Sequence, residues 1–150
     1  MEFEHESGFG FEKLNFNGML NRLSELIYYA NKKKGFYEDC PPAFTIEKEC
    51  VEAGLNYPDV EYRRKQWQLA YLGNKIMLMV GELAEAHEGL RHNNPASEHI
   101  PEFSALEEEM ADTIIRILDF CGYQKLRIEE AINAKLDYNA TRPHKHGKQF

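Results

Sequence analysis

The sequence predicts an all-α protein that folds as an antiparallel four-helix bundle. Apolar residues recur at intervals of three and four along four separate segments of the 150-residue chain, which is the spacing of one helix face. The connections between these segments carry proline, glycine and asparagine, and strand patterns are essentially lacking. Amphipathic helices joined in this way bury their apolar faces against one another.

The first helix is expected over residues 17–34, where "NGMLNRLSELIYYANKKK" has helical apolar spacing and Gly35 supplies a natural stop. A long loop follows over residues 36–58, because "CPPAF" and "GLNYP" interrupt any regular element. One short helix is predicted inside this loop, around residues 47–53.

The second main helix is expected over residues 59–91. Its apolar residues step by three and four without interruption, which is the pattern of a helix-packing seam. They are Leu69, Leu72, Ile76, Met79, Leu83, Ala86 and Leu90. Gly73 and Gly81 lie within this helix, and each weakens it by roughly 1 kcal/mol relative to alanine.

The third helix is expected from Ser104 to about Cys121, because Ser104 and Glu107 have the spacing of a capping box. The last helix begins near Arg127 or Ile128 and ends at about Thr141, since a proline follows shortly afterwards. The apolar stripe of the third helix consists of Leu106, Met110, Ile114, Ile117 and Cys121.

Length and composition predict one domain over residues 1–150, with flexible ends at about 1–14 and 143–150. Hydrophobic content of 43% and charged content of 29% are typical of a globular protein. The net charge of −7 argues against nucleic-acid binding. Three cysteines without a CxxC pair indicate neither a zinc site nor a disulfide framework. Without an evident leader or membrane-spanning run, a cytoplasmic location without membrane association is expected.

The second main helix carries two carboxylates beside its apolar seam. Glu82 and Glu85 are three residues apart and therefore project in similar directions. Each precedes a seam residue, Leu83 or Ala86, by one position. The pair is therefore expected to border the core.

The third helix repeats this arrangement. Glu109 and Asp112 are also three residues apart, and Glu109 precedes the stripe residue Met110. Asp119 continues the acidic row beyond Arg116. If the two helices meet at these faces, four carboxylates converge, and without a cation they would repel one another.

A single acidic pair of this kind is most often a solvent-exposed flank of a helix. Two pairs in matching phase on consecutive helices favour a metal site instead. Carboxylate oxygens without suitably spaced cysteine or histidine favour Mg²⁺, with Mn²⁺ as a substitute.

The last helix presents polar groups where core residues would be expected. Its face runs from Ile128 and Ile132 to Lys135, Asn139 and Arg142. These last three side chains suit phosphate or carboxylate oxygens, although ion pairing with the acidic row is an alternative role. The following "RPHKHGKQF" is a basic tail that either supplies further donors or only improves solubility.

Three stretches, "GELAEAHEGLR", "EEEMADTIIRILD" and "KLDYNATRPHKHGK", resemble the motifs of the MazG-like all-α NTP pyrophosphohydrolases. That superfamily also includes dimeric dUTPases and phosphoribosyl-ATP pyrophosphatases. The likeness extends over about residues 67–148. Many members have EExxE where this chain has Gly81 at the first position.

The resemblance implies a Mg²⁺-dependent enzyme that converts a nucleoside triphosphate, often a deoxynucleotide, to the monophosphate and pyrophosphate. A metal-activated water would attack the α-phosphate. The implied metal ligands are Glu82, Glu85, Glu109 and Asp112. Either Glu82 or Glu85 would orient or deprotonate the water, and Lys135, Asn139 and Arg142 would bind substrate.

The resemblance also implies a homodimer or homotetramer with sites near the subunit contacts. Trp67 and Tyr71 are candidates for stacking on the base, although packing is the commoner role for Trp67.

Two other functions compete with this interpretation. A non-catalytic helical regulator could bind nucleotide or a protein partner at the same acidic cleft, and Gly81 favours this alternative. A di-iron bundle would need ExxH pairs on its helices, and the helical glutamates here lack histidine at that spacing.

Overall fold

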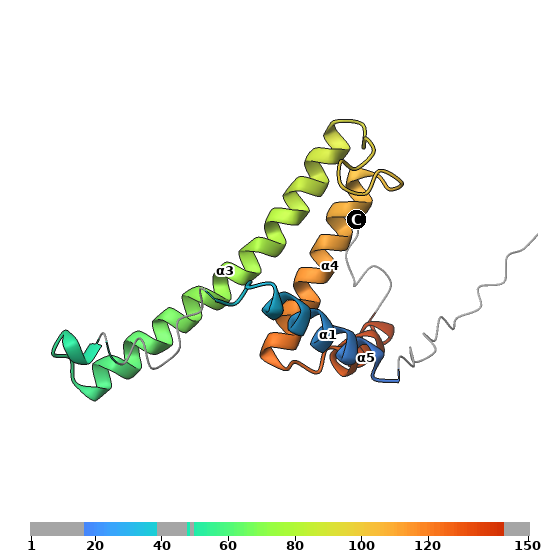
Figure 1. Cartoon of the computed structure of the whole chain (residues 1–150). Helices are drawn as coiled ribbons and strands as arrows, with labels where there is room; N and C mark the ends of the chain where they lie inside the picture. The colour runs from blue at the N-terminus through green and yellow to red at the C-terminus, as the bar shows by residue number, and fades with distance from the viewer. Residues whose placement is uncertain (1–16, 39–47, 49, 143–150) are drawn as a thin grey trace, which may run out of the picture.

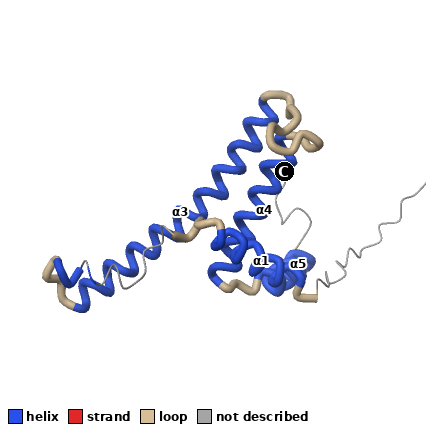
Figure 2. Tube along the Cα trace, in the orientation of Figure 1, coloured by secondary structure: helices blue, strands red, loops and turns tan. Residues whose placement is uncertain are grey.

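The computed structural model describes residues 17–38, 48 and 50–142. These residues are predominantly helical, which confirms the all-α class (Figure 2). Apart from one bridge between Ala96 and Ser104, the described residues form no strand pairing. None of their helices is both long and apolar enough to cross a lipid bilayer. Residues 48 and 50–52 are helical, in agreement with the short helix predicted around residues 47–53. Residues 47 and 49 lie outside the described residues, as do residues 1–14 and 143–150.

The two longest helices form an antiparallel hairpin. Helix α3 (Tyr57–Arg91) is the longest, and α4 (Ala105–Gln124) runs back along its second half (Figure 1). The capping box predicted at the start of α4 is present, because Ser104 and Glu107 each bond to the other's backbone N–H. The first part of α3 extends away from the other main helices (Figure 1).

The two shorter helices lie at the far end of α4. Helix α1 (Met19–Lys33) packs against α4, and α5 (Ile128–Ala140) contacts α1 (Figure 1). Helices α1 and α4 approach closely at Gly122, where a side-chain methyl group would overlap the carbonyl of Ser24. The absence of a side chain at this position is therefore what lets the two backbones meet.

Helices α1 and α5 cap each other's first turn. The Glu129 carboxylate accepts hydrogen bonds from the N–H of Gly18 at 2.8 Å and of Leu20 at 3.1 Å. In return, Asn21 Oδ1 accepts a hydrogen bond from the Glu129 N–H at 3.2 Å. Glu129 is buried, so these donors replace hydrogen bonds that its side-chain oxygens would otherwise make to water. The exchange joins two segments that lie more than 100 residues apart in the chain.

Replacing Glu129 with alanine is expected to lower the free energy of unfolding by about 2 kcal/mol, because backbone donors at the start of α1 lose a charged acceptor. Urea denaturation followed by circular dichroism measures the change. Asp137→Asn, at an exposed position of the same helix, is the control and should have little effect. Equal stability of the Glu129→Ala variant and the unmodified protein would contradict the capping role.

The apolar seams predicted on α3 and α4 do not form the core of a single chain. Ala86 and Cys121 are buried, but most of the other seam residues are exposed. The exposed ones are Leu69, Ile76, Leu83 and Leu90 on α3, and Met110, Ile114 and Ile117 on α4. The prediction placed the wrong face inward. The faces that meet carry Glu82, which bonds to Arg116, and Gly89, which lies against Ala105.

Candidate metal centre and adjoining pocket

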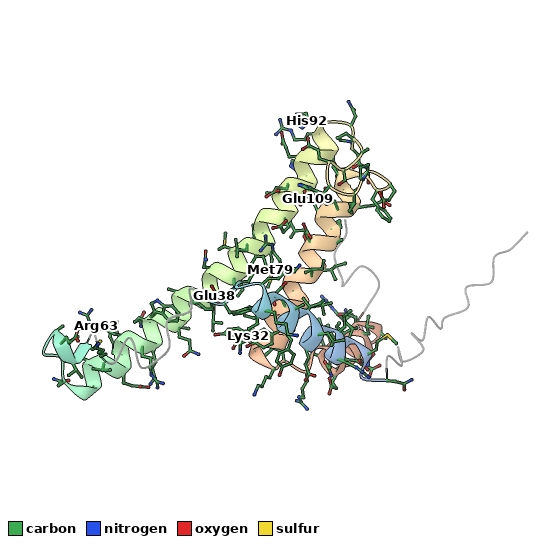
Figure 3. The ribbon with its side chains drawn as sticks, viewed as in Figure 1. Lys32, Glu38, Arg63, Met79, His92 and Glu109 are labelled. Carbon is green, nitrogen blue, oxygen red and sulfur yellow. The ribbon has the colours of Figure 1, made fainter. Side chains whose placement is uncertain are left out.

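Three of the four acidic residues predicted as metal ligands converge between α3 and α4. Glu82 comes from α3, and Glu109 and Asp112 come from α4. Figure 3 shows Glu109 on the first half of α4, beside α3. One carboxylate oxygen from each lies within 4.8 Å of the others. Glu82 is only 7% exposed. The antiparallel hairpin therefore gathers three carboxylates in a group that could hold a divalent cation.

Glu85, the fourth predicted ligand, is exposed and lies outside this group of three. It lies one helical turn beyond Glu82 and close enough to Glu109 to raise the pKa of that carboxyl. Glu85 therefore borders the centre on its solvent side.

The pKa values of Glu109 and Asp112 on α4 are raised by burial and by the neighbouring negative charges. Burial, followed by the charge of Glu85 and a hydrogen bond with Glu82, raises the pKa of Glu109 to about 7. Burial and the charge of Glu82 also raise the pKa of Asp112, against the opposing effect of Arg116. A cation bound here would offset this repulsion.

Arg116 is a member of the site that the sequence interpretation missed. Its Nε donates a hydrogen bond to Glu82 Oε1 at 2.5 Å, so the guanidinium partly neutralises the buried carboxylate. The available signal was its spacing, because Arg116 follows Asp112 by four residues and lies on the same face of the helix.

A pocket of about 630 Å³ adjoins the acidic centre. Asp112 and Arg116 form part of its wall, so the pocket and the carboxylates share residues. The other lining residues come from α3, from α4 and from the C-terminal part of α1 and the turn that follows it. They are Asn31, Lys34, Phe36, Tyr71, Asn74, Lys75, Leu78, Ile115, Asp119 and Phe120.

Aromatic rings and one cation lie beside this pocket. Lys75 Nζ lies 4.1 Å from the centre of the Tyr37 ring and donates a hydrogen bond to the Phe36 carbonyl at 3.3 Å. Of the two residues considered for base stacking, Tyr71 lines the pocket, and Trp67 stacks on Tyr71 with ring centres 5.2 Å apart. Apolar ring faces beside cationic and amide groups suit an organic anion.

The predicted substrate-binding residues Lys135, Asn139 and Arg142 do not lie beside this centre within one chain. They lie on or just beyond α5, at the far end of α4 from Glu109 (Figure 3). Lys135 and Arg142 both approach the ring of Tyr138, with Lys135 Nζ 4.6 Å from its centre.

The raised pKa of Glu109 predicts a pH-dependent stability in the absence of metal. In the folded protein Glu109 keeps its proton up to about pH 7, against an ordinary pKa of 4.5. Its contribution to stability is therefore complete below pH 4.5 and is lost as the pH rises through about 7. The Glu109→Gln variant has no titratable group at this position. The melting temperature of the variant, relative to that of the unmodified protein, should therefore increase from pH 5 to pH 8.

Thermal denaturation in EDTA tests this expectation, and melting curves that shift in parallel at all pH values would contradict it. Mg²⁺ should raise the melting temperature of the unmodified protein more at pH 8 than at pH 6, because the carboxyls must lose their protons to bind a cation.

Comparisons of the chain with protein-family models, with curated proteins and with solved structures give no match. The chemistry of the site therefore follows from its own residues. Three converging carboxylates can hold a hard divalent cation, and the pocket beside them offers cations, amides and rings.

Proposed function

We propose that the protein is a Mg²⁺-dependent nucleoside triphosphate pyrophosphohydrolase of the MazG-like all-α type, which converts an NTP or dNTP to the monophosphate and pyrophosphate. The observation that carries the proposal is the convergence of Glu82, Glu109 and Asp112 beside a pocket large enough for part of a nucleotide. Mn²⁺ is the expected substitute for Mg²⁺.

The residues of the centre have separate roles in this proposal. Glu82, Glu109 and Asp112 hold the metal, which when bound offsets phosphate charge and makes water more acidic. Glu85 is exposed beside them and accepts the proton of the attacking water. Arg116 lies in both the centre and the pocket wall, where its guanidinium suits a phosphate oxygen.

The exposed seams support assembly of two copies into an antiparallel four-helix bundle. On α3 the exposed residues Leu69, Ile76, Leu83 and Leu90 recur every seven residues, which is the spacing of helices that pack against one another. The neighbouring α4 exposes Met110, Ile114 and Ile117. A second copy of this hairpin is the occupant we propose, because its apolar stripes match these in length and spacing. A homodimer of this kind could pair further into a homotetramer.

This assembly also offers a role for the polar face of α5. Lys135 and Asn139 lie on α5 and Arg142 lies just beyond it, at the far end of α4 from the acidic centre of their own chain (Figure 1). In the proposed oligomer they bind substrate phosphates at a site near the subunit contact, as cations and amides do elsewhere.

A panel of NTPs and dNTPs incubated with the protein and Mg²⁺ tests the reaction. The expected products are nucleoside monophosphate and pyrophosphate, resolved by anion-exchange chromatography, with no turnover in EDTA. Release of orthophosphate alone would contradict cleavage at the α-phosphate. Tight nucleotide binding without any turnover would favour the non-catalytic regulator.

A further inference from the structure

The two carboxylate oxygens of Asp119 differ in their hydrogen bonding. The residue is 7% exposed, and its Oδ2 accepts a hydrogen bond from the Tyr37 hydroxyl at 2.6 Å. Its Oδ1 is buried and has no hydrogen-bond partner among the residues that the structure describes. Asp119 also lines the pocket beside the acidic centre. A buried acceptor without a donor lowers the stability of the fold. A ligand that donates a hydrogen bond to this oxygen would remove that penalty.

The position of Asp119 on α4 relates this oxygen to the metal centre. Asp119 follows Asp112 by seven residues, which is two helical turns, or about 10 Å along the axis on the same face. A phosphate bound through a cation at the acidic centre would therefore leave room for the rest of a nucleotide to extend toward Asp119. The pocket that both residues line is also lined by Phe36, Tyr71, Asn31 and Asn74.

We propose that this pocket binds the nucleoside part of the substrate, and that Asp119 Oδ1 accepts a hydrogen bond from an N–H or O–H of that nucleoside. The inference rests on the proposed function for the identity of the ligand. Carboxylate oxygens accept hydrogen bonds, so Asp119 favours a donor at this point over a carbonyl oxygen. Tyr37 holds the carboxylate in place through Oδ2 and acts as a positioning residue.

Two sources of the donor can be separated with matched ligands. Cytosine nucleotides carry an amino group where uracil nucleotides carry a carbonyl, and adenine and hypoxanthine nucleotides differ in the same way. Ribo-, deoxy- and dideoxynucleotides of one base differ only in sugar hydroxyls. Isothermal titration calorimetry with the monophosphates, in the absence of metal, measures binding without depending on hydrolysis. The unmodified protein should prefer the donor-bearing member of at least one series by about tenfold.

Asp119→Asn is the variant that isolates the effect. Its carbonyl oxygen can still accept from Tyr37, while its amide places a donor where Oδ1 was. The preference within the discriminating series should fall about tenfold or reverse. Asp59→Asn makes the same chemical change at an exposed position on the projecting part of α3 and should leave the preference unchanged.

The outcomes assign the donor or reject the inference. A changed cytosine-to-uracil or adenine-to-hypoxanthine ratio assigns Asp119 to a base amine, and a changed ratio within the sugar series assigns it to a hydroxyl. No preference in the unmodified protein, or equal ratios in the protein and Asp119→Asn, overturns the inference. The first of these needs no variant, so a poorly folded Asp119→Asn does not prevent the test. Selective binding without turnover would reject the proposed reaction and keep the assignment of the pocket.

Discussion

Replacing Glu82 with glutamine is expected to lower Mg²⁺-dependent turnover by about 100-fold or more, because the buried member of the acidic centre loses its charge. The side chain keeps its size, so the packing of α3 on α4 should survive. Rates with the preferred nucleotide, measured across a range of Mg²⁺ concentrations, give the effect. The increase in melting temperature that Mg²⁺ produces should shrink in the same variant.

Glu88→Gln is the matched control for this change. Glu88 lies on the same helix, six residues further on, but it is exposed, and among the described residues it pairs with Arg91 and His92 at the surface. Surface pairs of this kind contribute little, so turnover and the Mg²⁺ response should stay near those of the unmodified protein. Near-normal turnover in Glu82→Gln, with circular dichroism showing an intact fold, would remove the metal centre from the proposal.

The second large effect is expected at the exposed seam. Ile76→Glu should raise the dissociation constant of the proposed dimer by about 100-fold or more, because a carboxylate would have to leave water when two seams meet. Ile76 is 48% exposed in a single chain, so the substitution should leave the fold of the monomer intact. Sedimentation velocity across a range of protein concentrations measures the dissociation constant.

Ala70→Glu adds the same charge to the same helix as a control. Ala70 is exposed and lies one position beyond the seam residue Leu69, which turns it about 100° around the axis. It should leave the association unchanged. If the unmodified protein sediments as a monomer at all concentrations, or if Ile76→Glu associates as well as Ala70→Glu, the seam does not bind a second copy.

Much of the local structure could be predicted from the sequence because its causes are local. The start of α4 at Ser104 follows from a capping box whose members are three residues apart. The end of α3 at Arg91 and that of α5 at Ala140 agree with the predicted ends to within a residue. Within one helix, the three-residue spacing of Glu109 and Asp112 was also enough to place them on one face.

Residues from different helices were harder to relate. The sequence interpretation placed Glu82 at the edge of the core, whereas the structure buries it in the contact between α3 and α4. It mentioned Arg116 only as a residue that the acidic row passes and gave it no role, although this side chain is a hydrogen-bond partner of Glu82. It recognised Asp119 only as a further acidic residue, because its partner Tyr37 is 82 positions away in the chain.

The sequence by itself determined, to within about three residues, where the four main helices begin and end, and that acidic pairs recur on two of them. Capping, helical periodicity and turn residues act over a few positions, so they can be interpreted without knowing the neighbours of a helix. The tertiary structure decided which face of α3 meets α4. An apolar stripe shows only that a face avoids water, and it does not specify whether the covering surface comes from the same chain. Here the acidic faces meet within the chain, and the apolar stripes remain exposed.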